Sequence, residues 1–428
     1  MERGHNSRYS VWIFNHYAVG PGVPGGTRHY DIGRELAKHG WRVTIFSGVY
    51  PHRIPLLSRR FVAEGVPVET HEGVSFVAVP AMPHEGTRAS RVCSMLSYVL
   101  GAMKAVRGHT PPDIVIGSSV HPFAAWIAWR LARRMGCSYV FEIRDLWPES
   151  IIQLGNVSRR HPFIMLLSHI ERVLVNHSDR IVSPLPNVHA YLDTLGVPMH
   201  RVAVVPNGVD KTRLDIQDAG LPSHLVTIFD QLKDAFVVAY VGSHGLANRL
   251  DIVIDAAAKC ISRSNRRVEF LFVGDGPEKP RLRQRVSELR LRNVTFVDRV
   301  DKELVIPLLL RCNAGVIAWA GVPLYQYGIS PNKLFDYMLA GLPVVMAGNS
   351  PNNPISNSGG GVVVPYDDAD GMAREIMNLA GNRDDARIMG LLGREYVLER
   401  HSSACLASAL EAVLMDCLGA DNGARSKR

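Results

Sequence analysis

The 428-residue sequence has few cysteines, and their spacing excludes the usual cysteine-based sites. Its six cysteines are scattered singly, with no CxxC pair and no cluster of histidines nearby. Small secreted domains carry dense cysteines, whereas scattered ones are typical of a reducing compartment. We therefore expect neither a zinc site nor a disulfide framework.

Long apolar runs are also missing. No stretch reaches the roughly 18 uninterrupted apolar residues of a membrane-spanning helix, and the first 17 residues lack the apolar segment of a signal peptide. We expect a cytoplasmic protein, with any membrane contact peripheral and at the inner face of the plasma membrane.

Acidic residues are scarce in the first half of the chain. Residues 1–205 contain 22 Lys and Arg but 14 Asp and Glu, a net charge of +8, whereas residues 206–428 contain 26 of each. A basic face suits nucleic acid, an anionic membrane or a phosphate-bearing substrate. Because no basic segment is interleaved with aromatic residues, nucleic acid is the least favoured of the three, and we expect none.

Apolar strands and helices alternate along the chain, and the alternation breaks once and restarts. This pattern predicts the α/β class, with two Rossmann-like, doubly wound domains. The break follows the turn-rich stretch VPNGVD at 205–210, so we place the domains at 1–205 and 206–401. Near the end, we predict helices at 371–379 and 402–418, the second packing back towards the first domain, and a frayed tail at 419–428.

Residues 329–345, ISPNKLFDYMLAGLPVV, predict a loop, a short helix, a turn and a buried strand. Either Ser330 or Asn332 can cap the helix, and Gly341 suits the left-handed position after it.

Two charged residues stand out in this stretch, Lys333 and Asp336. A lysine at a helix N-terminus suits a phosphate, and a carboxylate one turn later can accept hydrogen bonds from the two hydroxyls of a ribose. The alternative is a solvated lysine and a helix-surface aspartate.

Glycine-rich stretches at 20–27, 241–249 and 273–278 follow predicted strands. Their backbone N–H groups can approach a phosphate or a sugar closely. The first stretch, GPGVPGGT, is not a GxGxxG fingerprint, and alone each stretch is also compatible with an ordinary turn.

Two further stretches place polar residues at strand ends. His121 follows the strand predicted at 113–117, where it either faces a ligand or simply caps a helix. Arg144 and Asp145 follow the strand at 139–143, where they either bind a ligand or form an internal ion pair.

Together these stretches resemble the retaining glycosyltransferases of family 4, which have the GT-B fold. The resemblance is carried by GGT at 25–27, FEIRDLWPES at 141–150, VPNGVD at 205–210, VGSHGLANRLD at 241–251, VGDGPE at 273–278 and SPNKLFDYMLAGLPVV at 330–345. Within the family, the sequence is similar to the WbuB-like N-acetyl-L-fucosamine transferases of O-antigen and capsule biosynthesis.

The resemblance implies a role for each motif residue. Asp336 would bind the donor ribose, Arg249 would neutralise the donor diphosphate with help from Lys333, and His121 would lie near the transferred sugar. Arg144 and Asp145 would bind the acceptor. The implied donor-binding residues are Gly25, Gly26, Gly242, Arg249, Gly274, Gly276, Ser330, Asn332, Lys333, Leu334 and Asp336.

Two positions depart from the family pattern. The first acid of the family's paired-acid motif would lie eight positions before Asp336, where this chain has Gly328, and a common arginine is replaced by Ser243. Both replacements concern the donor, and they are consistent either with a deoxy or N-acetylated sugar that has fewer hydroxyls to bind or with reduced activity.

The expected reaction is transfer of a sugar, with retention, from a UDP-sugar to a lipid-diphosphate-linked saccharide. Cations at the diphosphate replace a metal, so we expect no cofactor and no metal. Basic and apolar segments at 53–61 and 82–91 suggest contact with an anionic membrane. Two alternatives remain: a sugar-nucleotide epimerase using Glu142, Asp145 and Glu149 as acid and base, or a non-catalytic sugar-nucleotide-binding subunit.

Overall fold

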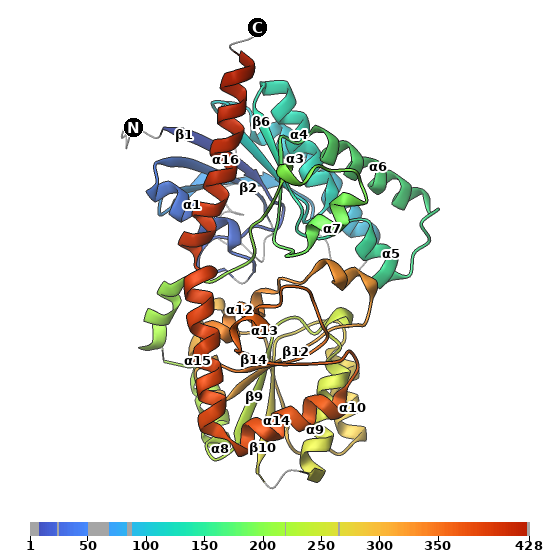
Figure 1. Cartoon of the computed structure of the whole chain (residues 1–428), viewed down its shortest axis with the longest axis vertical. Helices are drawn as coiled ribbons and strands as arrows, with labels where there is room; N and C mark the ends of the chain where they lie inside the picture. The colour runs from blue at the N-terminus through green and yellow to red at the C-terminus, as the bar shows by residue number, and fades with distance from the viewer. Residues whose placement is uncertain are drawn as a thin grey trace. The chain divides into compact units, whose positions relative to one another are not determined.

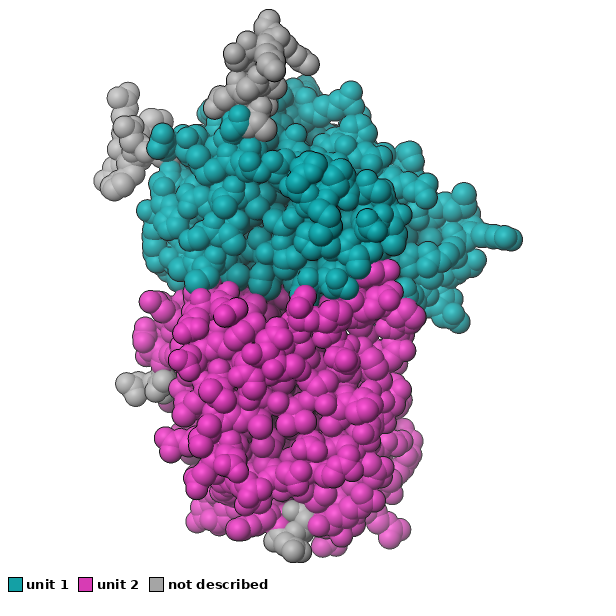
Figure 2. All heavy atoms as spheres, viewed as in Figure 1, with its two compact units in different colours: residues 1–206, 403–428 teal, residues 207–402 magenta. Residues whose placement is uncertain are grey.

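The structure is a computed structural model that describes residues 8–23, 25–49, 68–83, 88–218, 220–263 and 266–425. The chain divides into two compact units, residues 1–206 with 403–428 and residues 207–402 (Figure 2). Segment 53–61, expected above to contact lipid, lies outside the described residues, as do residues 84–87 of the segment 82–91.

The first unit is built on a sheet with the strand order β3-β4-β2-β1-β5-β6-β7-β8, parallel except for the β3–β4 pair. Its central strands are apolar and buried on both faces, as expected for a parallel sheet covered by helices. The strands are β1 (Tyr9–Phe14), β2 (Trp41–Val49), β3 (Val68–His71), β4 (Val74–Pro80), β5 (Ile114–Ser118), β6 (Ser138–Glu142), β7 (Arg180–Ser183) and β8 (Val202–Val204).

Helices cover both faces of this sheet (Figure 1). One layer contains α1 and α16, whose apolar side chains share a core with the strands, and the other contains α3, α4 and α6, packed side by side. The bounds are α1 (Arg28–Lys38), α3 (Arg88–Ala105), α4 (Pro122–Met135), α5 (Glu149–Gly155), α6 (Pro162–His177), α7 (Val188–Asp193), η1 (Met199–Arg201) and α16 (Ser403–Arg425).

The second unit has a fully parallel sheet in the order β11-β10-β9-β12-β13-β14. Its strands are β9 (Phe236–Val241), β10 (Val268–Val273), β11 (Val294–Val297), β12 (Ala314–Ala318), β13 (Val344–Ala347) and β14 (Gly361–Val364). Its helices are η2 (Lys211–Asp218), α8 (Ser223–Leu232), η3 (Leu246–Asn248), α9 (Leu250–Arg263), α10 (Lys279–Glu288), α11 (Lys302–Leu309), η4 (Pro323–Tyr327), α12 (Asn332–Leu339), α13 (Pro354–Ser358), α14 (Ala369–Gly381) and α15 (Arg383–Arg400). Two doubly wound α/β domains, the predicted fold class, are thus confirmed.

The C-terminal region differs from the prediction. The sequence analysis places no helix between 379 and 402, yet α15 fills most of that interval. Its glycines look like helix breakers, but they permit close packing: a Cβ on Gly390 would lie 1.9 Å from the carbonyl oxygen of Gly341. In addition, α16 continues to Arg425, past residue 418, where the sequence analysis ends it.

Candidate functional site

In the second unit, the chain leaves β9 towards β10 on one side and later returns to β12 on the other. Ligands of doubly wound domains bind beyond the carboxyl ends of the strands at such a reversal. The loops after β9, β10 and β12 therefore form the candidate donor site, and the predicted glycines lie in the first two.

The two glycines after β10 are required by close contact with the backbone of the loop after β9. A Cβ on Gly274 would lie 2.0 Å from the carbonyl oxygen of Gly242, and one on Gly276 would lie 2.6 Å from the carbonyl oxygen of His244. Both residues also have φ angles, +139° and +157°, that favour glycine. Only glycine therefore lets these two loops meet at the strand ends.

Lys333, on α12, lies against the loop that follows β9. A Cβ on Gly242 would lie 3.1 Å from Lys333 Cε. The ammonium donates to Tyr240 Oη and to Asn248 Oδ1, both at 2.7 Å, and lies 4.3 Å from the centroid of the Tyr240 ring. Its hydrogen-bond partners are thus neutral, and no carboxylate within the described ranges is ion-paired with it.

Burial without a counter-ion disfavours the charged form of this lysine. It lowers the pKa of Lys333 from 10.5 to about 7. An anion placed beside the ammonium would raise this pKa again and would supply the missing counter-charge. Lys333 is therefore a largely buried basic group without a paired carboxylate within the described residues.

Arg249 is in a different electrostatic state. Its guanidinium donates to both carboxylate oxygens of Asp251 at 3.0 to 3.2 Å and to Asp367 Oδ1 at 2.5 Å. Hydrogen bonding to Asp251 raises the pKa of Arg249. The two aspartates already neutralise this arginine, so a diphosphate would have to compete with them.

Asp336, the predicted ribose ligand, lies on α12 and accepts a hydrogen bond at Oδ1 from Nη1 of Arg213 in η2. Both side chains are largely buried. The sequence analysis did not identify Arg213, because nothing in the sequence connects two residues 123 positions apart. The other carboxylate oxygen, Oδ2, has no hydrogen-bond partner within the described residues and can accept from a ligand.

The start of α12 differs from the predicted capping. The N-cap residue is Pro331, and neither Ser330 nor Asn332 caps the helix. Ser330 Oγ instead accepts from the backbone N–H of Asn207 at 3.0 Å, so the VPNGVD motif holds this loop. Asn332 is exposed. Leu334, by contrast, is fully buried, and its N–H donates to the carbonyl of Pro331, so this N–H is not free to bind a sugar nucleotide.

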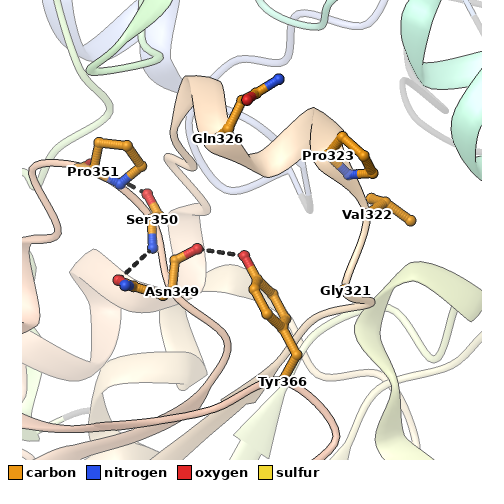
Figure 3. Close-up of a pocket in the computed structure, with 8 residues that line it drawn as sticks. All are labelled: Gly321, Val322, Pro323, Gln326, Asn349, Ser350, Pro351 and Tyr366. Atoms are coloured by element: carbon orange, nitrogen blue, oxygen red, sulfur yellow. Dashed lines mark hydrogen bonds between the residues drawn. The ribbon is translucent and has the colours of Figure 1, made fainter.

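A hollow of about 520 Å³ lies in the same unit, and Figure 3 shows Tyr366 and Asn349 on one side of it and Val322 and Pro323 on the other. Its remaining lining residues are Gly321, Gln326, Ser350 and Pro351. Trp319 lies between this hollow and Lys333. The Trp319 ring is 5.7 Å from the Lys333 ammonium. The Trp319 Cβ lies next to Gly348, as does the ring of Tyr366, which lines the hollow.

Gly328, which stands at the position of the family's first acid, follows the short helix η4 that lines this hollow. Its φ of +101° favours glycine, and its N–H donates to the carbonyl of Tyr325 at 3.0 Å. The hollow therefore adjoins the backbone position at which the family carboxylate is missing.

Sequence reasoning also missed His244, which follows β9. Its side chain is completely buried, and within the described residues neither ring nitrogen has a hydrogen-bond partner. Burial, together with the nearby charge of Lys279, lowers the pKa of His244 to about 4, so the ring is neutral. The glycine-rich stretch around His244 is the one sequence signal that could have identified this residue.

In the first unit, the sheet reverses between β1 and β5, and a histidine follows each of these strands. His121 caps α4 by accepting from the N–H of Ala124 at Nδ1, and its Nε2 lies 2.8 Å from His16 Nδ1. Because Nδ1 of His121 accepts, the neutral ring carries its proton on Nε2 and donates it to His16. Burial lowers the pKa of His121 to about 3, in keeping with this neutral pair.

His121 is 0% exposed, and both of its ring nitrogens are used within the protein. The direct sugar contact expected from the sequence is therefore not available in this arrangement. Its partner His16, which the sequence analysis did not identify, is also fully buried, so the two rings form an internal pair.

The stretch after β6 contains the predicted acceptor-binding residues. Asp145 is exposed, and its carboxylate has no hydrogen-bond partner within the described residues. Arg144 is half-buried, and its N–H donates to Ser119 Oγ at 3.1 Å. The alternative of a direct Arg144–Asp145 ion pair is not observed in the described part of the chain.

Glu142 is instead the buried acid of this region. It accepts from Arg28 Nε at 3.0 Å and contacts His29 Nε2 at 2.7 Å. Burial opposes its ionisation, but His29 and Arg28 hold the pKa of Glu142 well below its usual value. Arg28 also donates to the carbonyls of Val205 and Pro206, so this network fixes the end of the glycine loop 25–27.

Within that loop, Gly25 is exposed with φ of +153°, and Gly26 is half-buried. They follow β1, at the same edge of the sheet as His16 and Asp145.

Within the described ranges, no three His, Cys, Asp or Glu side chains gather to hold a metal ion, and no helix is long and apolar enough to span a membrane.

Two family models match the chain in succession. The "Glycosyl transferase 4-like domain" matches residues 25–208, and "Glycosyl transferases group 1" matches residues 235–382. Together these regions cover well over half of the chain, one in each unit. The chain therefore belongs to the glycosyltransferases, and its two parallel-sheet α/β domains place it in the GT-B type.

Individual proteins show more distant similarity. D-inositol 3-phosphate glycosyltransferase 2 from Catenulispora acidiphila is 25% identical over 296 residues, 66% of this chain and 66% of the relative, so the match spans just under two thirds of the relative's length. Sucrose-phosphate synthase from Thermosynechococcus elongatus has a TM-score of 0.75 at 18% identity, covering 96% of this chain and all of the other. HepE from Anabaena, solved with UDP-glucose, has a TM-score of 0.66 at 15% identity, covering 95% and 100%.

Proposed function

We propose that this glycosyltransferase transfers an N-acetylamino or deoxyamino sugar from a UDP-sugar to a lipid-diphosphate-linked saccharide, with retention and without a metal. The acceptor class comes from the sequence resemblance to the transferases of O-antigen and capsule assembly. The nucleotide is supported by HepE, a fold relative solved with UDP-glucose.

The observation that carries the proposal is the state of Lys333. The ammonium is held by neutral groups at the carboxyl end of β9, next to loops that only glycine can form. Departure of UDP develops negative charge on phosphate oxygens, and a preorganised cation there stabilises the transition state. We assign the main role at the diphosphate to Lys333 and a secondary role to Arg249, whose charge is already paired.

The proposed chemistry needs no further protein group at the reacting atoms. The bond from the anomeric carbon to the diphosphate breaks while the acceptor oxygen bonds to the same face of that carbon. The acceptor proton passes to the departing phosphate. Asp336, oriented by Arg213, would accept the ribose hydroxyls through its free oxygen, and the buried His16–His121 pair would position the loops near the sugar.

The hollow beside Gly328 supports the sugar class. Apolar side chains, including Val322, Pro323 and Pro351, supply much of its lining, and no carboxylate lines it. Against these apolar side chains, a deoxy or N-acetyl methyl group fits better than an extra hydroxyl does, because a hydroxyl at that part of the wall would lack a hydrogen-bond partner.

An epimerase, the enzyme alternative left open by the sequence, has less support. It would use carboxylates as acid and base, but Glu142 is ion-paired with Arg28 and Glu149 is ion-paired with Arg159. Asp145 remains as a single available carboxylate of the three. A measurement of sugar transfer distinguishes the transferase from the non-catalytic binding subunit.

Calorimetric titration with UDP, with and without EDTA, tests the donor site. We expect wild type to bind equally in both conditions and Asp336→Ala to bind more weakly. A screen of UDP-amino sugars with a lipid-diphosphate saccharide then tests transfer, and NMR of the product reports the anomeric configuration. Binding that EDTA abolishes, or free donor converted to its epimer, would contradict the proposal.

A further inference from the structure

The segment that contains α3, β5 and α4 has an unusual charge composition. From Arg88 to Met135 it holds seven Lys and Arg residues and one acid, Asp113. The carboxylate of Asp113 accepts from the N–H and the hydroxyl of Ser10, so it is engaged at the edge of the sheet. Neither helix contains an acidic residue.

Six cations of this segment have described side chains, and all six are exposed. None of the six whose exposure is described is ion-paired with a carboxylate in the described part of the chain. They are Arg91, Lys104, Arg107, Arg130, Arg133 and Arg134. Arginines of the second unit, by contrast, are often paired, for example Arg263 with Asp370 and Arg285 with Asp255.

Apolar side chains are exposed on α3 beside these cations. Leu96, Leu100 and Met103 are 47%, 59% and 43% exposed, and their spacing of four and three residues places them on one stripe of the helix. Because α3 packs against α4, the stripe and the α4 arginines belong to the same helical layer (Figure 1).

Tryptophans lie under the arginines of α4. The Arg130 guanidinium is 5.8 Å from the centroid of the half-buried Trp126, and that of Arg133 is 6.0 Å from the centroid of Trp129. Exposed leucines with Trp and Lys or Arg on an acid-free surface are characteristic of segments that lie in a membrane interface.

The second unit supplies an internal comparison. Helix α15 also exposes apolar residues, with Ile388 at 58% and Leu391 at 46%. It carries four acids and four arginines, however, so its net charge is zero. Exposed apolar side chains thus occur in both units, but on α15 acidic residues balance the positive charge, whereas α3 and α4 contain no acidic residue.

We propose that the α3–α4 surface, defined by Leu96, Leu100 and Met103 with the six cations named above, docks the protein on an anionic lipid bilayer. The charge selects an anionic surface, and the apolar stripe requires a partner with an apolar interior, which a nucleic acid lacks. This inference rests on the proposed function, because docking would bring the protein to the membrane that contains its lipid-linked acceptor.

Vesicle co-sedimentation of the full-length protein tests the proposal, using phosphatidylcholine with and without phosphatidylglycerol. We expect binding that requires phosphatidylglycerol and weakens with salt. Each cation near an anionic membrane contributes about fivefold in affinity, so the triple variant Arg130→Gln, Arg133→Gln, Arg134→Gln should bind on the order of 100-fold more weakly. Leu96→Ser with Leu100→Ser should also lose binding.

The matched control is Ile388→Ser with Leu391→Ser, which removes equally exposed apolar residues from α15 and should bind vesicles as wild type does. Calorimetry with UDP accompanies every variant and should be unchanged. Equal binding to both vesicle types, a triple variant that binds like wild type, or binding to heparin but not to vesicles would overturn the proposal. If the protein binds vesicles but no nucleotide, the proposed function is contradicted and the docking surface is still supported.

Discussion

Lys333 and Arg249 give the sharpest test of the donor site, because both are cations near the same loop but only Arg249 is paired with carboxylates. A hydrogen bond to a charged group contributes about 1.5–3 kcal/mol. Lys333→Met should therefore weaken UDP binding by roughly 10- to 150-fold. Arg249→Met should weaken it by no more than about threefold, because charge already compensated by Asp251 and Asp367 contributes little.

The pH dependence adds an independent measurement. The pKa of Lys333 is about 7 without ligand because burial disfavours its charge, and a bound diphosphate raises it. Below pH 7 the lysine is charged in both states, and its contribution to affinity is constant. Above pH 7 binding takes up a proton, so the affinity should fall by up to about tenfold per pH unit until the pKa of the complex is reached.

Isothermal titration calorimetry with UDP from pH 6 to 9, in buffers of different ionisation enthalpy, measures both affinity and proton uptake. Lys333→Arg retains the cation but cannot lose its proton, so its profile should be flat above pH 7. Melting temperatures control for folding, and Lys333→Met should melt no lower than wild type because it removes a poorly solvated charge. A flat wild-type profile, or Arg249→Met as damaging as Lys333→Met, would refute this account.

Three further changes test other parts of the molecule. His16→Ala and His121→Ala should each lower kcat by a similar factor, with the double variant no worse than either alone, because the two rings act as one hydrogen-bonded unit; additive losses in steady-state kinetics would contradict this. Glu142→Gln leaves the Arg28 charge unpaired and should cost about 3–5 kcal/mol in urea denaturation. The wild-type contribution of this acid, whose pKa is depressed, is present above the unfolded pKa of about 4.3 and is lost as acid protonates it, so the variant and wild type should converge at low pH. Gly328→Ala should cost about 1–2 kcal/mol because its φ of +101° strains a side chain, and an unchanged melting temperature would exclude that strain.

Much of the donor site was predictable because its residues lie close in sequence to strand ends. Parallel strands place their carboxyl ends at one edge, so Gly242, Gly274 and Lys333 could be brought together from the alternation of strands and helices alone. The glycines were predicted as sites of close ligand approach. Gly274 has a different structural reason, since it lets one loop backbone touch the next, whereas Gly242 makes room for the Lys333 side chain.

The pairings that set the charge state of the site could not be predicted. Arg213 meets Asp336 across 123 residues, and His16 meets His121 across 105. Such contacts depend on the register of strands and on loop paths, for which local sequence carries no periodicity. The predicted role of Arg249 shows the consequence: its position was plausible, but Asp367, 118 residues away, alters its availability.

The missing carboxylate at 328 connects the sequence departure to the shape of the site. A carboxylate deleted without other change would leave ordinary backbone, whereas Gly328 has a glycine conformation and the next N–H, of Ile329, donates to Ser350 Oγ at 3.2 Å. Ser350 also lines the hollow. The backbone next to Gly328 is thus tied to the wall of the hollow. We infer that the sugar is selected by the fit of the hollow and not by a carboxylate at 328, which is the arrangement expected for a donor that offers a methyl or acetyl group in place of a hydroxyl.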